Sequence, residues 1–160
     1  MPVTGARRVL VIGYGNPGRG DDGLGPALAA AIEELGLDGV TVDIDYQLTV
    51  DHAAPIAAHD LVIFADAMIG LPVPFRLDPV GTAAPSALGS HQVSPEAALA
   101  LAGLLFGHAP PGWILAIGGV EFGEVKEGLS PQARANLAEA IAFLRDWIGE
   151  TMMASALSAQ

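Results

Sequence analysis

Hydrophobic positions along the chain follow two alternating periods, and these predict strands separated by helices. Apolar, β-branched runs predict buried strands at 8–12, 60–67 and 112–120, and alternation of apolar and polar residues predicts a strand at 40–46. Apolar residues spaced three or four apart predict helices at about 21–36, 95–106 and 132–149, with a weaker helix at 50–59 that Pro55 breaks. The run 73–80 contains two prolines and predicts an edge strand, where proline is tolerated.

This alternation predicts the fold class. Strands that alternate with helices form right-handed crossovers, which give a parallel sheet covered on both faces. We therefore expect a single α/β domain over 1–150, with a twisted, mostly parallel sheet of about five strands sandwiched between helices. The last ten residues, 151–160, are expected to form a disordered tail.

Two helix starts carry recognisable capping signals. Ser94 precedes Pro95 and Glu96, and Ser130 precedes Pro131. A serine at the N-cap, a proline in the first turn and an acid near the positive end of the helix dipole are typical of a helix start.

Charge and composition narrow the function classes. The formal net charge is −11, which disfavours nucleic acid and anionic membranes as partners. The sequence has no cysteine, so disulfide and thiolate chemistry are excluded. The longest apolar stretch, 97–106, is too short to span a bilayer, and the first residues do not resemble a signal peptide. We expect a cytoplasmic protein.

A glycine-rich loop follows the first strand and is open to two interpretations. Residues 13–18 match the G-x-G-x-x-G dinucleotide fingerprint, which after a strand indicates pyrophosphate binding. However, Pro17, Gly18 and Gly20 delay the helix until the adjacent acids Asp21 and Asp22, which would meet a pyrophosphate with like charge. Dinucleotide binding is therefore the weaker interpretation.

Acids also end other strands, and these suggest a metal site. Asp22 follows the first strand, Asp66 ends the third, and His91 lies in a Gly-rich segment before the next helix. Ligands of open parallel sheets bind beyond the carboxyl ends of the strands, and two carboxylates with an imidazole suit nickel, zinc or cobalt. Simpler roles remain open: Asp21 as a helix cap, Asp66 as a turn residue and His91 as a structural histidine.

Three motifs resemble those of the hydrogenase maturation endopeptidases. "GYGNPGRGDDGLG" (13–25) resembles the family's opening G-x-G-N-x-x-x-x-D-[DE]-x-x-G, "IFADA" (63–67) its second acidic strand, and "SHQVSP" (90–95) its histidine loop. "GLSP" (128–131), before the last helix, is also typical of the family. The resemblance therefore covers nearly the whole chain.

The resemblance implies a function and a site. Family members cut a peptide from the carboxyl end of the large-subunit precursor of a nickel-iron hydrogenase after nickel insertion. Their nickel-recognition acids and histidine correspond to Asp22, Asp66 and His91, which are expected to be metal ligands and catalytic residues. Nickel is expected to arrive within the precursor, although other divalent ions could occupy the site. The family also implies a monomer.

The sequence departs from the family pattern after the second strand. Many members carry a "D-G-G-T" loop there, whereas this chain has "DYQLTVD" (45–51), which resembles the branch associated with NAD-linked, bidirectional hydrogenases. We hypothesise that Asn16, Gln47 and Thr49 contact the precursor. Two simpler roles stay open: Asn16 holding the first loop and Thr49 capping the following helix.

For hydrolysis, metal polarisation of a carbonyl or of water is favoured. The sequence contains neither a G-x-S-x-G elbow nor an H-E-x-x-H helix. Asp21 is a candidate general base or a group that orients a ligand, while the three other histidines are expected to be exposed or structural: His52, His59 and His108. The rival hypothesis is a non-hydrolytic, metal-sensing assembly module that docks on a nickel-loaded partner.

Overall fold

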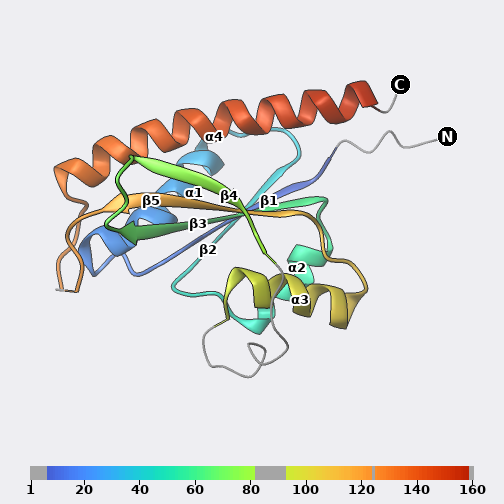
Figure 1. Cartoon of the computed structure of the whole chain (residues 1–160), viewed down its shortest axis with the longest axis horizontal. Coiled ribbons are helices and arrows are strands. Elements are labelled where there is room, and N and C mark those ends of the chain that lie inside the picture. The colour runs from blue at the N-terminus through green and yellow to red at the C-terminus, as the bar shows by residue number, and fades with distance from the viewer. Residues whose placement is uncertain (1–6, 82–92, 124, 159–160) are drawn as a thin grey trace.

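A computed structural model describes residues 7–81, 93–123 and 125–158 of the chain (Figure 1). Its five strands form one sheet in the order β2-β1-β3-β5-β4. The strands are β1 (Val9–Tyr14), β2 (Val40–Asp45), β3 (Leu61–Ile69), β4 (Phe75–Pro79) and β5 (Gly112–Gly119). The helices are α1 (Leu24–Glu34), α2 (Ala53–Ala57), α3 (Pro95–Phe106) and α4 (Pro131–Ser158), with short 3-10 helices η1 (Gly20–Gly23) and η2 (Val50–His52).

The sheet is sandwiched between two helical layers, as predicted. Figure 1 shows α1 and α4 over one face and α2 and α3 over the other. Each face buries its own apolar cluster, one centred on α1 and α4 and one on α2 and α3. All strand pairs are parallel except that of β4 with β5, and β4 is the predicted edge strand. The prediction of a single α/β domain is confirmed.

The third strand extends beyond its neighbour, and this defines one end of the sheet. Pairing between β1 and β3 ends at Gly13 with Ala65, whereas β3 continues along β5 until Ile69 pairs with Gly119. Asp66 therefore lies inside β3, where it pairs with Ala116, and not at the strand end as the sequence predicted. The prediction missed this extension because the polar aspartate interrupts the apolar run.

Two glycines of the opening motif let α1 pack directly on the sheet. A Cβ on Gly25 would lie 2.4 Å from the Tyr14 carbonyl oxygen and 2.5 Å from that of Ala65. Gly15 has φ +145°, and a Cβ there would lie 2.0 Å from the Asp22 carbonyl oxygen. These glycines therefore have a packing role that needs no bound phosphate.

Three predictions about the helices were wrong. Helix α1 begins at Leu24, later than predicted, because the preceding residues form η1. Pro55 does not break α2, since it lies in the first turn, where its missing N–H leaves no helical hydrogen bond unmade. Helix α4 continues to Ser158, although a tail was predicted from 151; that segment contains no glycine or proline up to 158, and Met152 packs against the core.

Within 7–81, 93–123 and 125–158, no helix has the length and apolar character needed to cross a membrane.

We predict that Gly25→Ala destabilises the protein by about 3 kcal/mol or more, because the new methyl group overlaps backbone oxygens of two strands. The measurement is chemical unfolding. The matched control is Gly149→Ala, in α4, where a Cβ meets nothing within 4 Å, so helix propensity should make it stabilising by up to about 1 kcal/mol. Equal effects of the two substitutions would contradict the packing argument.

Candidate functional site

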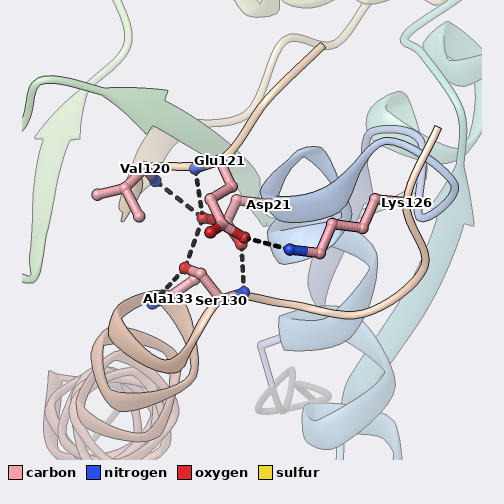
Figure 2. Close-up of polar contacts among 6 residues, drawn as sticks. All are labelled: Asp21, Val120, Glu121, Lys126, Ser130 and Ala133. Carbon is pink, nitrogen blue, oxygen red and sulfur yellow. Dashed lines mark hydrogen bonds and ion pairs between the residues drawn. The ribbon is translucent and has the colours of Figure 1, made fainter. Parts of the chain in front are cut away.

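Asp21 is a buried anchor that joins three segments distant in sequence. Its Oδ2 accepts hydrogen bonds from the N–H groups of Val120 (2.8 Å) and Glu121 (2.9 Å) and from the Ser130 hydroxyl (2.7 Å). Its Oδ1 accepts from the Ser130 N–H at 2.7 Å. Figure 2 shows this carboxylate enclosed by the end of β5 and the start of α4. The Ser130 hydroxyl in turn accepts from the Ala133 N–H at 3.1 Å, which confirms Ser130 as a helix cap.

This geometry assigns Asp21 a role that the sequence did not indicate. The N-cap residues of η1 and α1 are Arg19 and Gly23, so the prediction that Asp21 caps its own helix was wrong. Burial alone would raise the pKa of Asp21, but the surrounding backbone N–H groups and the Ser130 hydroxyl outweigh it and hold this pKa below its usual value. A carboxylate engaged in four hydrogen bonds is suited to anchoring rather than to accepting a proton.

Asp22 and Asn16 hold the opening loop in shape. The Asn16 N–H donates to Asp22 Oδ2 at 2.8 Å, and the Gly18 N–H donates to Asn16 Oδ1 at 2.9 Å. The local role expected for Asn16 is thus confirmed. Asp22 follows Asp21 in the same 3-10 turn, so the two side chains diverge. Asp21 reaches the start of α4, whereas Asp22 lies near Asp66, whose pKa its charge raises.

Three polar side chains form a row across neighbouring strands at the carboxyl end of the sheet. On one side of β1, Tyr14 pairs with Asp45 of β2. On the other side, Asp66 of β3 lies one residue beyond the last β1–β3 pair, which places it beside Tyr14. Because side chains alternate along a strand, Tyr14 shares a face with Ile12, and Asp66 shares that face with Phe64. This is the face covered by α2 and α3. We call Asp45, Tyr14 and Asp66 the strand-end row.

The surroundings of Asp66 and Tyr14 are unfavourable to negative charge. Burial raises the pKa of Asp66 to about 6, and the nearby Asp22 charge adds to the rise. The Ala67 N–H, which donates to Asp66 Oδ1 at 2.8 Å, and a hydrogen bond with Tyr14 act in the opposite direction. Burial also raises the pKa of Tyr14, with further contributions from Asp66 and from Glu96 in the first turn of α3. Two close carboxylates under partial burial favour a cation as their ligand.

His52 stabilises the loop after β2. Its buried ring accepts the Thr49 N–H at Nδ1 (3.0 Å), so the neutral ring carries its proton on Nε2. That nitrogen lies 3.7 Å from carboxylate oxygens of both Asp43 and Asp45. Thr49 caps η2 by accepting the Asp51 N–H at 3.2 Å. The capping role of Thr49 and the structural role of His52 are confirmed.

The structure brings together only part of the predicted site. The charge of Asp22 contributes to the raised pKa of Asp66, Gln47 is exposed beyond β2, and His91 lies outside the described residues. Across 7–81, 93–123 and 125–158, no three acidic, histidine or cysteine side chains are grouped so that they could hold a metal ion. The described residues therefore supply a pair of carboxylates that still needs a further donor.

Sequence reasoning missed Tyr14 and Glu96 as members of this region. A signal for Tyr14 exists, because it continues the alternation of Leu10 and Ile12 on one strand face. Glu96 was noticed only for its favourable place at a helix start. Its proximity to Tyr14 depends on how α3 packs on the sheet.

The fold is that of the hydrogenase maturation proteases. Solved structures of this class align with the chain over about nine-tenths of its length. No protein-family model matches the sequence, and no curated protein sequence matches it significantly.

Two solved structures represent the match. HybD, a hydrogenase maturating endopeptidase from E. coli, superposes with a TM-score of 0.66 and 21% identity, covering 90% of this chain and 93% of its own. HycI, a [NiFe] hydrogenase maturation protease from Thermococcus kodakarensis KOD1, superposes with a TM-score of 0.69 and 20% identity, covering 88% and 91%. The two superpositions establish a common fold, and at identities this low the likeness is one of fold alone.

We predict that Asp21→Asn destabilises the protein by about 3 kcal/mol or more at pH 7, because an amide presents N–H groups to backbone donors and lacks the charge that strengthens these bonds. Since the folded-state pKa of Asp21 is lowered, the deficit should shrink as the pH falls below about 4. Urea unfolding at several pH values measures it. Asp38→Asn, at an exposed aspartate between α1 and β2, is the control and should have little effect.

We predict the opposite sign for Asp66→Asn, which should stabilise the protein at pH 8. A rise in pKa from 3.8 to about 6 corresponds to at most about 3 kcal/mol of lost stability once the group is ionised. The folded-state pKa is raised, so the advantage of the variant should disappear as the pH falls through 6 toward 4. Unfolding midpoints of wild type and variant that stay parallel across this range would contradict the prediction.

Proposed function

We propose that the protein is an endopeptidase that removes the C-terminal extension from the nickel-loaded large-subunit precursor of a nickel-iron hydrogenase. One observation carries the proposal: on the fold of the hydrogenase maturation proteases, Asp22 follows β1 and Asp66 lies just past the last β1–β3 pair, so both acids lie at the carboxyl end of the sheet. These are the acids that the sequence motifs single out. Two structures with this fold are described as an endopeptidase and a protease of hydrogenase maturation, which supports the same activity here.

Asp22 and Asp66 are proposed to recognise nickel together with His91. Two carboxylates and an imidazole suit a borderline divalent ion, and the raised pKa of Asp66 reflects charge repulsion that such an ion would relieve.

In this proposal nickel belongs to the substrate, and the enzyme selects precursors that contain it. Asp22 accepts a hydrogen bond from the Asn16 N–H and Asp66 accepts one from the Ala67 N–H, so each acid is held by a backbone donor and keeps oxygen lone pairs for a metal ion. The nickel held in the precursor supplies Lewis-acid polarisation of a carbonyl or of water. Asp21 is proposed to support the site by fixing the turn that carries Asp22, because its own oxygens are engaged.

The loop after β2 is proposed to contact the precursor. Tyr46 and Gln47 are exposed there, next to the strand-end row, while Thr49 and His52 brace the loop from beneath. Gln47 is thus the better candidate for contact, and Thr49 contributes by capping η2. This loop also carries the proposed assignment to the branch that serves NAD-linked, bidirectional hydrogenases.

The proposal predicts that wild type shortens a nickel-loaded precursor, whereas Asp22→Ala, Asp66→Ala and His91→Ala reduce the rate by about 100-fold or more. Intact-mass spectrometry of the precursor measures the cleavage. Asp38→Ala, at an exposed acid in the turn before β2, is the matched control and should process normally. A precursor loaded with zinc or left without metal should be cut slowly or not at all, and Gln47→Ala should raise KM.

The same experiment tests the rival hypothesis of a non-hydrolytic assembly module. If wild type binds the nickel-loaded precursor but leaves its mass unchanged, the protein is a metal-sensing assembly module, and the endopeptidase proposal fails.

A further inference from the structure

Tyr14 is the one member of the strand-end row with both a hydrogen-bond donor and a largely apolar setting. It ends β1, its ring packs beside the cluster that contains Ile12 and Phe64, and it is only partly exposed. A phenylalanine would fill nearly the same volume. The hydroxyl therefore needs an explanation beyond packing.

We infer that Tyr14 is a positioning residue for Asp66, its hydroxyl donating the hydrogen bond that fixes the orientation of this carboxylate toward Asp22. The inference rests on the proposed function and deepens it, because it names a further residue on which precursor processing depends.

The geometry supports this from two sides. The Ala67 N–H holds Asp66 Oδ1 at 2.8 Å, and this bond alone leaves the carboxylate able to rotate about its own axis. Tyr14 comes from the neighbouring strand, one residue beyond the last β1–β3 pair, so it lies beside Asp66 on the same face of the sheet. A carboxylate only accepts, so the phenol must be the donor. Two donors from two adjacent strands define the plane of the carboxylate.

A fixed plane matters for the proposed chemistry. Asp22 is itself fixed by the Asn16 N–H at 2.8 Å, so the separation and mutual orientation of the two acids are set before a substrate arrives. Losing the phenol hydroxyl would let Asp66 adopt other orientations without changing the charge of the site. Such a loss should lower the rate of the bound complex more than the affinity for the precursor, because it disturbs the alignment of Asp66 and leaves the loop proposed to contact the precursor unchanged.

The sequence supplies a matched control for the test. Thr41 is exposed on β2, outside the loop proposed to contact the precursor. Tyr14→Phe and Thr41→Val each remove one hydroxyl group and nearly keep the volume of the side chain. We expect Tyr14→Phe to lower kcat for a nickel-loaded precursor by about tenfold with KM changed by less than about twofold, whereas Thr41→Val leaves kcat unchanged.

A second arm tests the contact without any processing assay. Thermal unfolding is measured for Tyr14→Phe in the wild-type background and in an Asp66→Ala background. A hydrogen bond between the two residues makes the loss in Tm caused by Tyr14→Phe smaller when Asp66 is absent. Equal losses in the two backgrounds would overturn the inference, as would a Tyr14→Phe protein with wild-type kcat.

The two arms separate the inference from the proposed function. If wild type fails to shorten a nickel-loaded precursor, the proposed function fails, and with it the role of Tyr14 in processing. The Tm comparison then still decides whether Tyr14 holds Asp66. If wild type processes the precursor and Tyr14→Phe does so equally well, the proposed function stands and the inference is overturned.

Discussion

The buried carboxylate of Asp21 determines how the functional end of the molecule is assembled. It binds the two residues that follow β5 and the residue that precedes α4, which are 99 to 109 residues away along the chain. Without it, backbone N–H groups of Val120, Glu121 and Ser130 would lose a charged acceptor in a region where the Ser130 donor is buried. The turn that carries Asp22 depends on this closure, because both acids belong to η1.

Asp21 and Asp66 thus have opposite effects on stability. Ionisation of Asp21 stabilises the folded protein, because hydrogen-bond donors surround the carboxylate and lower its pKa. Ionisation of Asp66 destabilises the folded protein, because burial and the charge of Asp22 raise its pKa. Residues that lower stability when ionised are typical of binding and catalytic sites, where the missing partner is supplied by a ligand. The protein offsets the cost at Asp66 with the closure made by Asp21.

The fold could be predicted from sequence because its signals are local. The buried strands are continuous apolar runs, and two prolines mark β4 as an edge strand. Ser94 and Ser130 cap the starts of α3 and α4, as their sequence context predicted. The errors occurred where tertiary packing overrides local pattern. Asp66 interrupts an apolar run yet remains in β3, since β5 continues to pair with it. No local pattern marked the partners of Asp21, because they become neighbours only after the sheet is formed.

The extension of β3 past the end of β1 has a thermodynamic consequence. It places Asp66 on regular backbone, with β5 on one side and Tyr14 close by, so this donor is part of the folded scaffold rather than of a loop that must become ordered. Binding a cation there therefore causes little further loss of conformational entropy. Such a rigid pair of acids also cannot move apart easily when no cation is present. Discrimination between loaded and empty partners would then come from repulsion that persists in the empty complex, which is a penalty on the wrong partner as much as an attraction to the right one.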